Sequence, residues 1–298
     1  MSFYQIKRIL IPLDFSKTSL KALDHAAHLA KLCDAEITLL HVPESLSVMS
    51  NSGYFDPPDF HEEYEKNISD QSDAKLGEIA AQLKKKGIAK VDTLTVIGNP
   101  KKEILKVSKN IKADLIVMGT HGTSGIKEFF VGSNTFSIIK DAKCPVLSVQ
   151  QDQKKPGFNN ILVPFRDKPH SREKVNYAID LGLLYKATIH VLGIDTEFTK
   201  AHKTKIEREA EQIKKIIEKR GLTCKVKVIS NTYLAETLLK HAADIGADLI
   251  ISMSDLDKTS ITEYFSGPYA QQIVNHSPIP VFSIRPQFNP DTIDLRFY

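Results

Sequence analysis

Glycines and a serine follow a short apolar run in the first half of the chain, with a spacing that suits phosphate binding. In MGTHGTSGIKEFFVGSNTF, residues 118–136, two residues separate Gly119 from Gly122, and nine residues later Gly132 precedes Ser133. Glycine lets a backbone approach a ligand closely, and the free N–H groups at a helix start favour an anion. The alternative interpretation is a connection whose glycines only make its turns.

Other phosphate and catalytic motifs do not match this sequence. No Gly-Lys-Ser/Thr closes the glycine-rich stretch, so it is not a Walker A loop, and it has no G-x-G-x-x-G. No H-E-x-x-H or Ser-His-Asp pattern stands out, and the 10 histidines are dispersed. A phosphate site without an evident catalytic base or arginine finger favours holding a phosphorylated ligand over hydrolysing it quickly.

Composition indicates an ordinary globular protein. The 298 residues suit about two domains, and 42% hydrophobic with 26% charged residues is typical of such chains. The net charge of +4 is spread out, and the run Lys84–Lys86 before Gly87 is typical of a helix end rather than a nucleic-acid patch. Three scattered cysteines suit a reducing compartment. With no signal-peptide pattern or membrane-span candidate, we expect a cytoplasmic protein that binds neither membrane nor nucleic acid.

The chain repeats itself once. KRILIPLDFS is echoed by NNILVPFRDK, and IKADLIVMG by IGADLIISM. Ile9 pairs with Ile161 at an offset of 152 residues, but Asp114 pairs with Asp248 at 134, so the first half is about 18 residues longer between them. We assign the excess to a loop at 43–62, rich in Ser, Pro and aromatic residues. The polar segment 151–157 is the predicted linker, giving domains at 1–150 and 157–298.

Strand and helix patterns alternate within each half. The first half has five predicted strands, at 8–13, 36–42, 91–97, 113–119 and 145–150. The predicted helices between them cover 16–33, a charged segment ending at Gly87, 99–110 and 132–142. Ser16 is the expected N-cap of the first helix, and Asn99 with Pro100 marks another helix start. This alternation predicts a parallel, doubly wound sheet.

The glycine motif, together with ILIPLDFS and LLHV, resembles the universal stress protein family, and the resemblance covers both halves. It implies an α/β fold with two tandem doubly wound domains, Rossmann-like and of the adenine nucleotide α-hydrolase type, each with a five-stranded parallel sheet. It further implies a stress-response regulatory or sensing protein. ATP, with Mg²⁺ or Mn²⁺ bridging its phosphates, would bind the first domain.

By the same resemblance, ten residues would form the nucleotide site. Asp14 and Val42 would contact adenine, and Pro12, Met118 and Gly119 would line the ribose side. The phosphates would lie against Gly122, Gly132, Ser133 and the backbone of Asn134, within reach of His121. The residues leave two alternatives open: Asp14 could instead complement a helix dipole, and His121 could face solvent.

The second half lacks most of this motif. Met253 or Ser254 stands in place of Gly119, and Leu256 or Asp257 in place of Gly122. Pro268 replaces Ser133 and offers neither an N–H nor a hydroxyl. Arg166 takes the place of Asp14. We therefore expect the second half to bind no nucleotide.

Several alternatives stay open at this level. The chain could be a slow ATPase or nucleotide-processing enzyme, or a structural stress scaffold without nucleotide. The last strand of each half is a predicted sheet edge, so the halves are expected to pair with each other, with a homodimer as a further option. The segment 43–62 could be a lid or a loose loop. The tail at 286–298, in which apolar and polar residues alternate near the end, could add a strand to a partner or be a frayed terminus.

Overall fold

The computed structural model describes residues 4–44, 58–120, 133–150, 156–167, 172–231, 233–254 and 269–285. The chain divides into two compact units, one spanning Ile6–Pro156 and the other beginning at Gly157. The start of the chain, before Ile6, groups with the second unit. Each unit is described by itself below.

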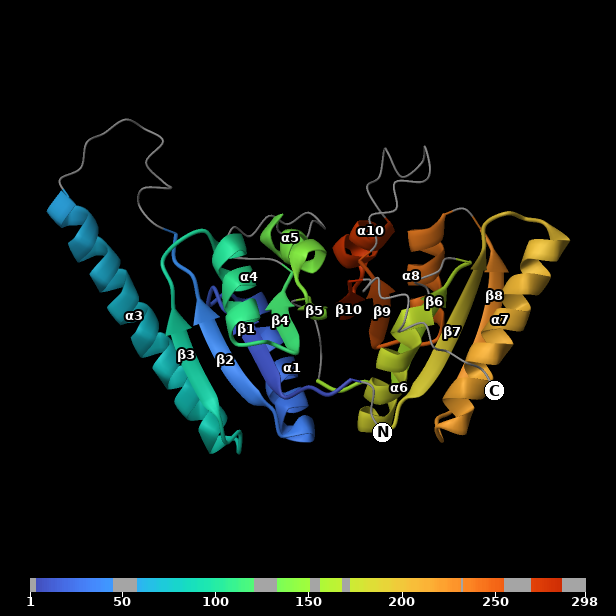
Figure 1. The fold of residues 1–298 in the computed structure, drawn as a ribbon, viewed down its shortest axis with the longest axis horizontal. Coiled ribbons are helices and arrows are strands. Elements are labelled where there is room, and N and C mark those ends of the chain that lie inside the picture. Colours follow the sequence, from blue (N-terminus) through green and yellow to red (C-terminus); the bar gives the residue numbers. More distant parts are fainter. Residues whose placement is uncertain are drawn as a thin grey trace. The chain divides into compact units, whose positions relative to one another are not determined.

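The first unit alternates strands and helices, as the sequence predicts (Figure 1). Its elements are β1 (Arg8–Pro12), α1 (Lys17–Cys33), β2 (Glu36–His41), α3 (Pro58–Lys85), β3 (Val91–Thr95), α4 (Pro100–Asn110), β4 (Leu115–Gly119), α5 (Ser133–Asp141) and β5 (Val146–Val149).

The second unit repeats the same plan. Its elements are β6 (Asn160–Phe165), α6 (Glu173–Tyr185), β7 (Thr188–Asp195), α7 (Lys200–Lys219), β8 (Cys224–Ser230), α8 (Leu234–Asp244), β9 (Leu249–Met253), α10 (Tyr269–His276) and β10 (Val281–Ile284). In the part of the chain that the structure describes, no helix has the length and apolar character to cross a membrane.

Both sheets are parallel and doubly wound. Strand order is β3-β2-β1-β4-β5 in the first unit and β8-β7-β6-β9-β10 in the second. Right-handed crossovers place α1 and α3 on one face of the first sheet and α4 and α5 on the other, with α6 and α7 opposite α8 and α10 in the second. The order reverses between β1 and β4 and between β6 and β9, and ligands of such sheets bind at the carboxyl side of that point.

Local signals in the sequence explain where the first-half helices begin. The Ser16 side chain accepts a hydrogen bond from the Ser19 N–H and caps α1. The Asn99 side chain does the same for Lys102 in α4, with Pro100 as first helical residue. One face of α1 is buried, with Ala26 fully inaccessible. Gly87 follows α3 with φ 90°, as a helix-ending glycine should.

The prediction of a loop throughout 43–62 is wrong at its end, because α3 begins at Pro58. Proline suits the first turn of a helix, where its missing N–H has no intrahelical partner to lose. The extra residues of the first half therefore lie partly in α3. This helix has 28 residues, whereas α7, its counterpart in the second unit, has 20. Residues 45–57 lie outside the described part.

A carboxylate holds the central strands together in each unit at their amino ends. Asp114, just before β4, accepts hydrogen bonds from the backbone N–H groups of Lys7 and Arg8 at 3.0 and 2.9 Å. Asp248, just before β9, accepts from Asn159 and Asn160 at 2.7 and 3.0 Å. The repeat alignment is therefore confirmed at these positions, and it supports comparing the halves residue by residue.

Tyr4 packs against the second unit although it stands at the start of the chain. Its ring centroid lies 4.8 Å from that of Tyr177 and 6.0 Å from that of Phe282. Its backbone N–H donates to Asp180 Oδ2 at 2.6 Å. An aromatic cluster of this kind stabilises beyond simple area burial.

We predict that Tyr4→Ala destabilises the second unit, since the cluster loses one of its three rings. The expected loss is about 1–3 kcal/mol in the free energy of unfolding, measured by urea denaturation. Gln5→Ala is the matched control, because Gln5 is exposed. Equal stability of the two variants would contradict a structural role for Tyr4.

Candidate functional site

Five of the predicted nucleotide-site residues lie at the carboxyl edge of the first sheet. Pro12 ends β1 and is paired in register with Leu40 of β2, and Asp14 follows within two residues. Val42 comes directly after β2, and Met118 with Gly119 ends β4. Parallel strands bring their carboxyl ends to one edge. The fold therefore brings these five residues to the same edge, on both sides of the strand-order reversal.

Asp14 belongs to a tight turn between β1 and α1. Its Oδ1 accepts a hydrogen bond from the Ser16 N–H at 3.0 Å, and Ser16 Oγ in turn accepts from the Ser19 N–H at 3.2 Å. Between them Phe15 adopts a left-handed backbone with φ 61°, which is rare for a bulky residue and concentrates at functional sites. One oxygen of Asp14 thus binds the N–H of the residue that caps α1. This contact agrees with the alternative interpretation, in which Asp14 belongs to the helix start.

An aromatic neighbour of this turn was not predicted from the sequence. The Phe15 ring lies 4.5 Å from the His41 ring between centroids, and Lys75 Nζ lies 5.2 Å from its centroid. His41 Nδ1 lies 2.6 Å from the Leu13 carbonyl oxygen, so Nδ1 carries the proton and donates. Phe15 and His41 therefore add ring surfaces beside Asp14 and Val42. No sequence pattern predicts the left-handed conformation of Phe15.

The structure gives Gly119 a packing role besides the predicted ligand role. A Cβ at this position would lie 2.9 Å from the backbone carbon of Thr18 and 3.0 Å from the Ser19 nitrogen, both in the first turn of α1. Any side chain would push α1 away from β4. Glycine is thus required here whether or not a ligand binds.

The first turn of α5 is tied to the same edge. Thr135 Oγ1 donates a hydrogen bond to the Gly119 carbonyl at 3.0 Å, so the amino end of α5 lies beside the carboxyl end of β4. Its first turn carries no acidic residue, and Asn134 is exposed. Ser133 is the first residue of α5. His121, Gly122 and Gly132 lie outside the described residues.

We predict that Gly119→Ala lowers stability in the absence of nucleotide. The added methyl must displace backbone rather than a flexible side chain, with an expected cost of about 1–3 kcal/mol. Gly77→Ala is the control, because nothing lies within 4 Å of a Cβ there and alanine favours a helix by up to about 1 kcal/mol. Urea denaturation measures both. An unchanged Gly119→Ala variant would leave only the ligand role for this glycine.

The corresponding edge of the second unit carries different side chains. β9 ends at Met253, as β4 ends at Gly119, so Met253 rather than Ser254 occupies the glycine position. Arg166 Cζ lies 4.7 Å from the ring centroid of Tyr269, the first residue of α10. By the repeat alignment, Arg166 replaces Asp14 and Tyr269 replaces Asn134. A side-chain pair thus stands where the first half has its predicted adenine and phosphate contacts.

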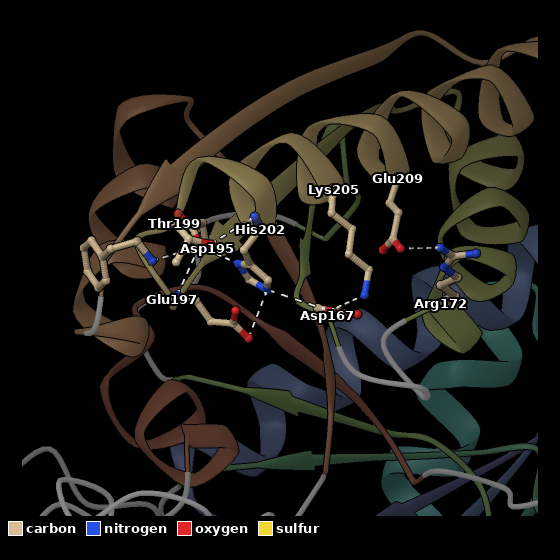
Figure 2. A network of polar contacts seen from close by, with 9 residues as sticks. Asp167, Arg172, Asp195, Glu197, Thr199, His202, Lys205 and Glu209 are labelled. Carbon is tan, nitrogen blue, oxygen red and sulfur yellow. Dashed lines mark hydrogen bonds and ion pairs between the residues drawn. The ribbon is translucent and has the colours of Figure 1, made fainter.

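A polar network lies at the ends of β7 and β8 in this unit (Figure 2). Asp195, the last residue of β7, is 1% exposed and accepts from His202 Nδ1 at 2.5 Å and from Ser230 Oγ at 2.8 Å. It also accepts from the N–H groups of Glu197 and Phe198. Burial alone would raise the pKa of Asp195, but these hydrogen bonds outweigh it and lower the pKa from 3.8 to about 2.

The other nitrogen of His202 faces two further carboxylates. Its Nε2 lies 3.8 Å from Asp167 Oδ2 and 3.7 Å from Glu197 Oε1. Lys205 Nζ lies 2.5 Å from the same oxygen of Asp167. Within the described ranges, no group of three or more histidine, cysteine or carboxylate side chains has a geometry that could hold a metal ion.

This network was missed in the sequence because its members come from the segments that follow β6 and β7, from the ends of β7 and β8, and from α7. Asp195 and His202 are seven residues apart, which matches no catalytic or metal motif. As Figure 2 shows, the charged groups point toward one another, and they include three carboxylates against His202 and Lys205. Carboxylates at this edge oppose the approach of a phosphate chain.

The network predicts a specific acid response. Because the folded pKa of Asp195 is depressed, its stabilising effect is complete above its unfolded value of 3.8 and is lost as pH falls toward about 2. We expect Asp195→Asn to cost about 2–4 kcal/mol at pH 7, and the difference from the natural chain to shrink below about pH 4.

Urea denaturation of the natural chain and Asp195→Asn across pH 7 to 3 measures this difference. Asp92→Asn is the control for loss of one exposed carboxylate. A difference that stays constant over this range would show that the Asp195 charge does not stabilise the fold.

Comparison with known proteins agrees with this architecture of two doubly wound sheets in tandem. Residues 5–150 and 157–285 each match the Usp family, described as the universal stress protein family. The chain therefore belongs to the universal stress protein family, as a member with two tandem domains of that family.

Two relatives each match about half of this chain, and one solved structure matches nearly all of it. Universal stress protein MJ0577 of Methanocaldococcus jannaschii is 31% identical over 155 residues, covering 49% of this chain and 95% of that protein. Universal stress protein YxiE of Bacillus subtilis is 34% identical over 146 residues, covering 48% of this chain and 98% of that protein. A universal stress protein structure from Archaeoglobus fulgidus matches 95% of this chain and 97% of its own, with a TM-score of 0.76 and 23% identity, which shows a shared fold.

Proposed function

We propose that the first half of this protein binds ATP and that the chain acts as a stress-response regulatory or sensing protein. The supporting observation is the gathering of Pro12, Asp14, Val42, Met118 and Gly119 at one sheet edge, beside the amino end of α5. The glycine motif that links Gly119 to α5 has the spacing of the nucleotide-binding branch of the family.

In this proposal adenine lies against Val42 and pairs with Asp14, whose Oδ1 already holds the Ser16 N–H. The ribose lies near Pro12, Met118 and Gly119.

The phosphates follow the glycine motif. They would contact Gly122, Gly132, Ser133 and the backbone of Asn134, with His121 in reach and Mg²⁺ or Mn²⁺ bridging them. A helix amino end without an acidic residue in its first turn favours such an anion.

We further propose that the second half binds no nucleotide. Met253 ends β9 where the first half has Gly119, and the Arg166–Tyr269 pair stands at the equivalents of Asp14 and Asn134. Pro268 replaces the Ser133 hydroxyl. Asp195 keeps its negative charge down to a low pH, so the nearby carboxylate network disfavours a triphosphate.

Two alternatives remain, a slow ATPase or nucleotide-processing enzyme and a structural scaffold without nucleotide. Release of phosphate from ATP with added metal would favour the first, and absence of nucleotide binding the second. The domain bounds 1–150 and 157–298, pairing of the halves, a homodimer and a cytoplasmic location stay predictions from the sequence.

The deciding experiment is calorimetric titration of the intact chain with ATP and Mg²⁺. We expect one site per chain, lost in a Gly122→Asp, Gly132→Val variant because side chains would fill the phosphate approach and add a like charge. Gly267→Val is the matched control, since Gly267 is the second-half counterpart of Gly132. It should leave binding unchanged.

Each other outcome of the titration has a defined meaning. Two ATP per chain would overturn the assignment of a silent second half. No binding by the folded intact chain would overturn ATP binding and move the scaffold to first place.

A further inference from the structure

A pocket with basic lining residues lies at the end of the second unit that is opposite its carboxyl edge. It has a volume of about 240 Å³ and is lined from the first residues of β6, β7 and β8 and from the end of α8. The lining residues used below are Asn160, His190, Lys225, Lys227, His241 and Ile245. Because it lies at the amino ends of the strands, it is separate from the carboxyl edge of the second unit.

Two lysines on β8 point to the side of the sheet that α8 covers. Side chains alternate along a strand, and a Cβ added to Gly193 of β7 would lie 2.8 Å from the Ile206 side chain of α7. His190 therefore points to the opposite face, and the register that pairs it with Lys225 places Lys225 and Lys227 there too. Both lysines are exposed and line the pocket.

His190 forms the wall between β6 and β8. It is 6% exposed, and its Nε2 lies 3.0 Å from Asn160 Oδ1. Burial lowers the pKa of His190, and the charges of Lys225 and His241 lower it further. Burial first, and the positive surroundings second, thus favour the neutral form of this ring.

His241 is the second buried histidine that lines the pocket. It is 6% exposed, and its buried Nδ1 has no hydrogen-bond partner among the described residues. Burial lowers the pKa of His241, Lys227 lowers it further, and only Asp244 acts in the other direction. A buried nitrogen without a partner is costly unless something else supplies the bond.

The first half has none of this chemistry at the equivalent place. Strand register aligns His190 with Thr38, Lys225 with Asp92 and Lys227 with Leu94. The helix alignment matches His241 to Val107, which is a buried apolar residue. Each of these positions differs in polarity or charge, so the positive pocket is a property of the second half alone.

We propose that this pocket binds the phosphate group of a compact phosphorylated metabolite. Lys225 and Lys227 supply charge, and the His241 imidazole, which lines the pocket, supplies a hydrogen-bond donor to the phosphate. Ile245 offers an apolar contact to the remainder of the ligand. The volume is below the usual range of about 300–1,000 Å³ for ligand pockets, which disfavours a whole nucleotide.

An anion in the pocket must raise the pKa of both histidines, since it favours their charged forms. By linkage, binding then strengthens as pH falls through the raised pKa values. The charged groups that shift the pKa values of the histidines are Lys225, Lys227 and Asp244, besides the effect of His241 on His190. Asp244 opposes an anion, as does Asp248, which accepts from the Asn160 N–H at the pocket.

The test follows the imidazole ¹⁵N–¹H signals of the intact chain during titration with inorganic phosphate and then glycerol 3-phosphate. We expect the signals of His190 and His241 to shift and both pKa values to rise. Lys225→Gln with Lys227→Gln should weaken binding about tenfold or more, since two charge-assisted contacts are lost. Lys215→Gln with Lys219→Gln is the control, with the same charge change on α7.

Three outcomes would overturn the proposal. They are a lack of response at both histidines, an equal response to sodium chloride at matched ionic strength, and unchanged affinity in the Lys225→Gln, Lys227→Gln variant. The readout is independent of ATP, because His190 and His241 lie outside the proposed nucleotide edge. Failure of one proposal therefore leaves the other intact.

Discussion

The pairing of β1 with β4 is the contact on which both the first sheet and its candidate site depend. The Asp114 carboxylate fixes it at the amino end by accepting the N–H groups of Lys7 and Arg8. At the carboxyl end the strand order reverses here, so α1 and α5 start on opposite faces of the sheet beside the same two strands. Gly119 lets the first turn of α1 approach β4, and Thr135 ties α5 to the Gly119 carbonyl. One strand pair thereby positions two helix starts.

The second unit keeps this scaffold and changes what it carries. Asp248 accepts hydrogen bonds from the start of β6 as Asp114 does from the start of β1. Both units therefore have the strand-order reversal at the same place. Its carboxyl edge, however, holds the Arg166–Tyr269 pair and a network in which carboxylates satisfy His202 and Lys205. Paired charges of this kind stabilise the fold but leave little attraction for a phosphate chain. The two units thus share the carboxylate contact at the amino ends of the strands but differ in the side chains at the carboxyl edge, so the fold and the site can vary independently.

The sequence predicts what local chemistry decides. Ser16 and Asn99 cap the helices that their residue types indicate, and the apolar runs became strands in a parallel sheet. Features made by distant contacts were not predictable. The Phe15 conformation depends on the turn around it, and the Gly119 contact needs α1 to lie against β4. The Asp195–His202 pair joins a strand end to a helix start across an exposed connection. None of these three features has a residue spacing that matches a sequence motif.

The distribution of charge suggests why a second copy is useful. In one parallel α/β sheet the carboxyl edge has the free N–H groups of helix starts, so an anion is favoured there by backbone alone. At the amino end the backbone provides no such helix starts, and an anion must be held by side chains. The second unit places Lys225, Lys227, His190 and His241 at that end, while its carboxyl edge is filled with paired acids. In this arrangement the first half keeps a carboxyl edge where backbone N–H groups favour an anion, and the second half carries a pocket whose charge comes from side chains. Under the two proposals, the halves would recognise different phosphorylated ligands on the same fold.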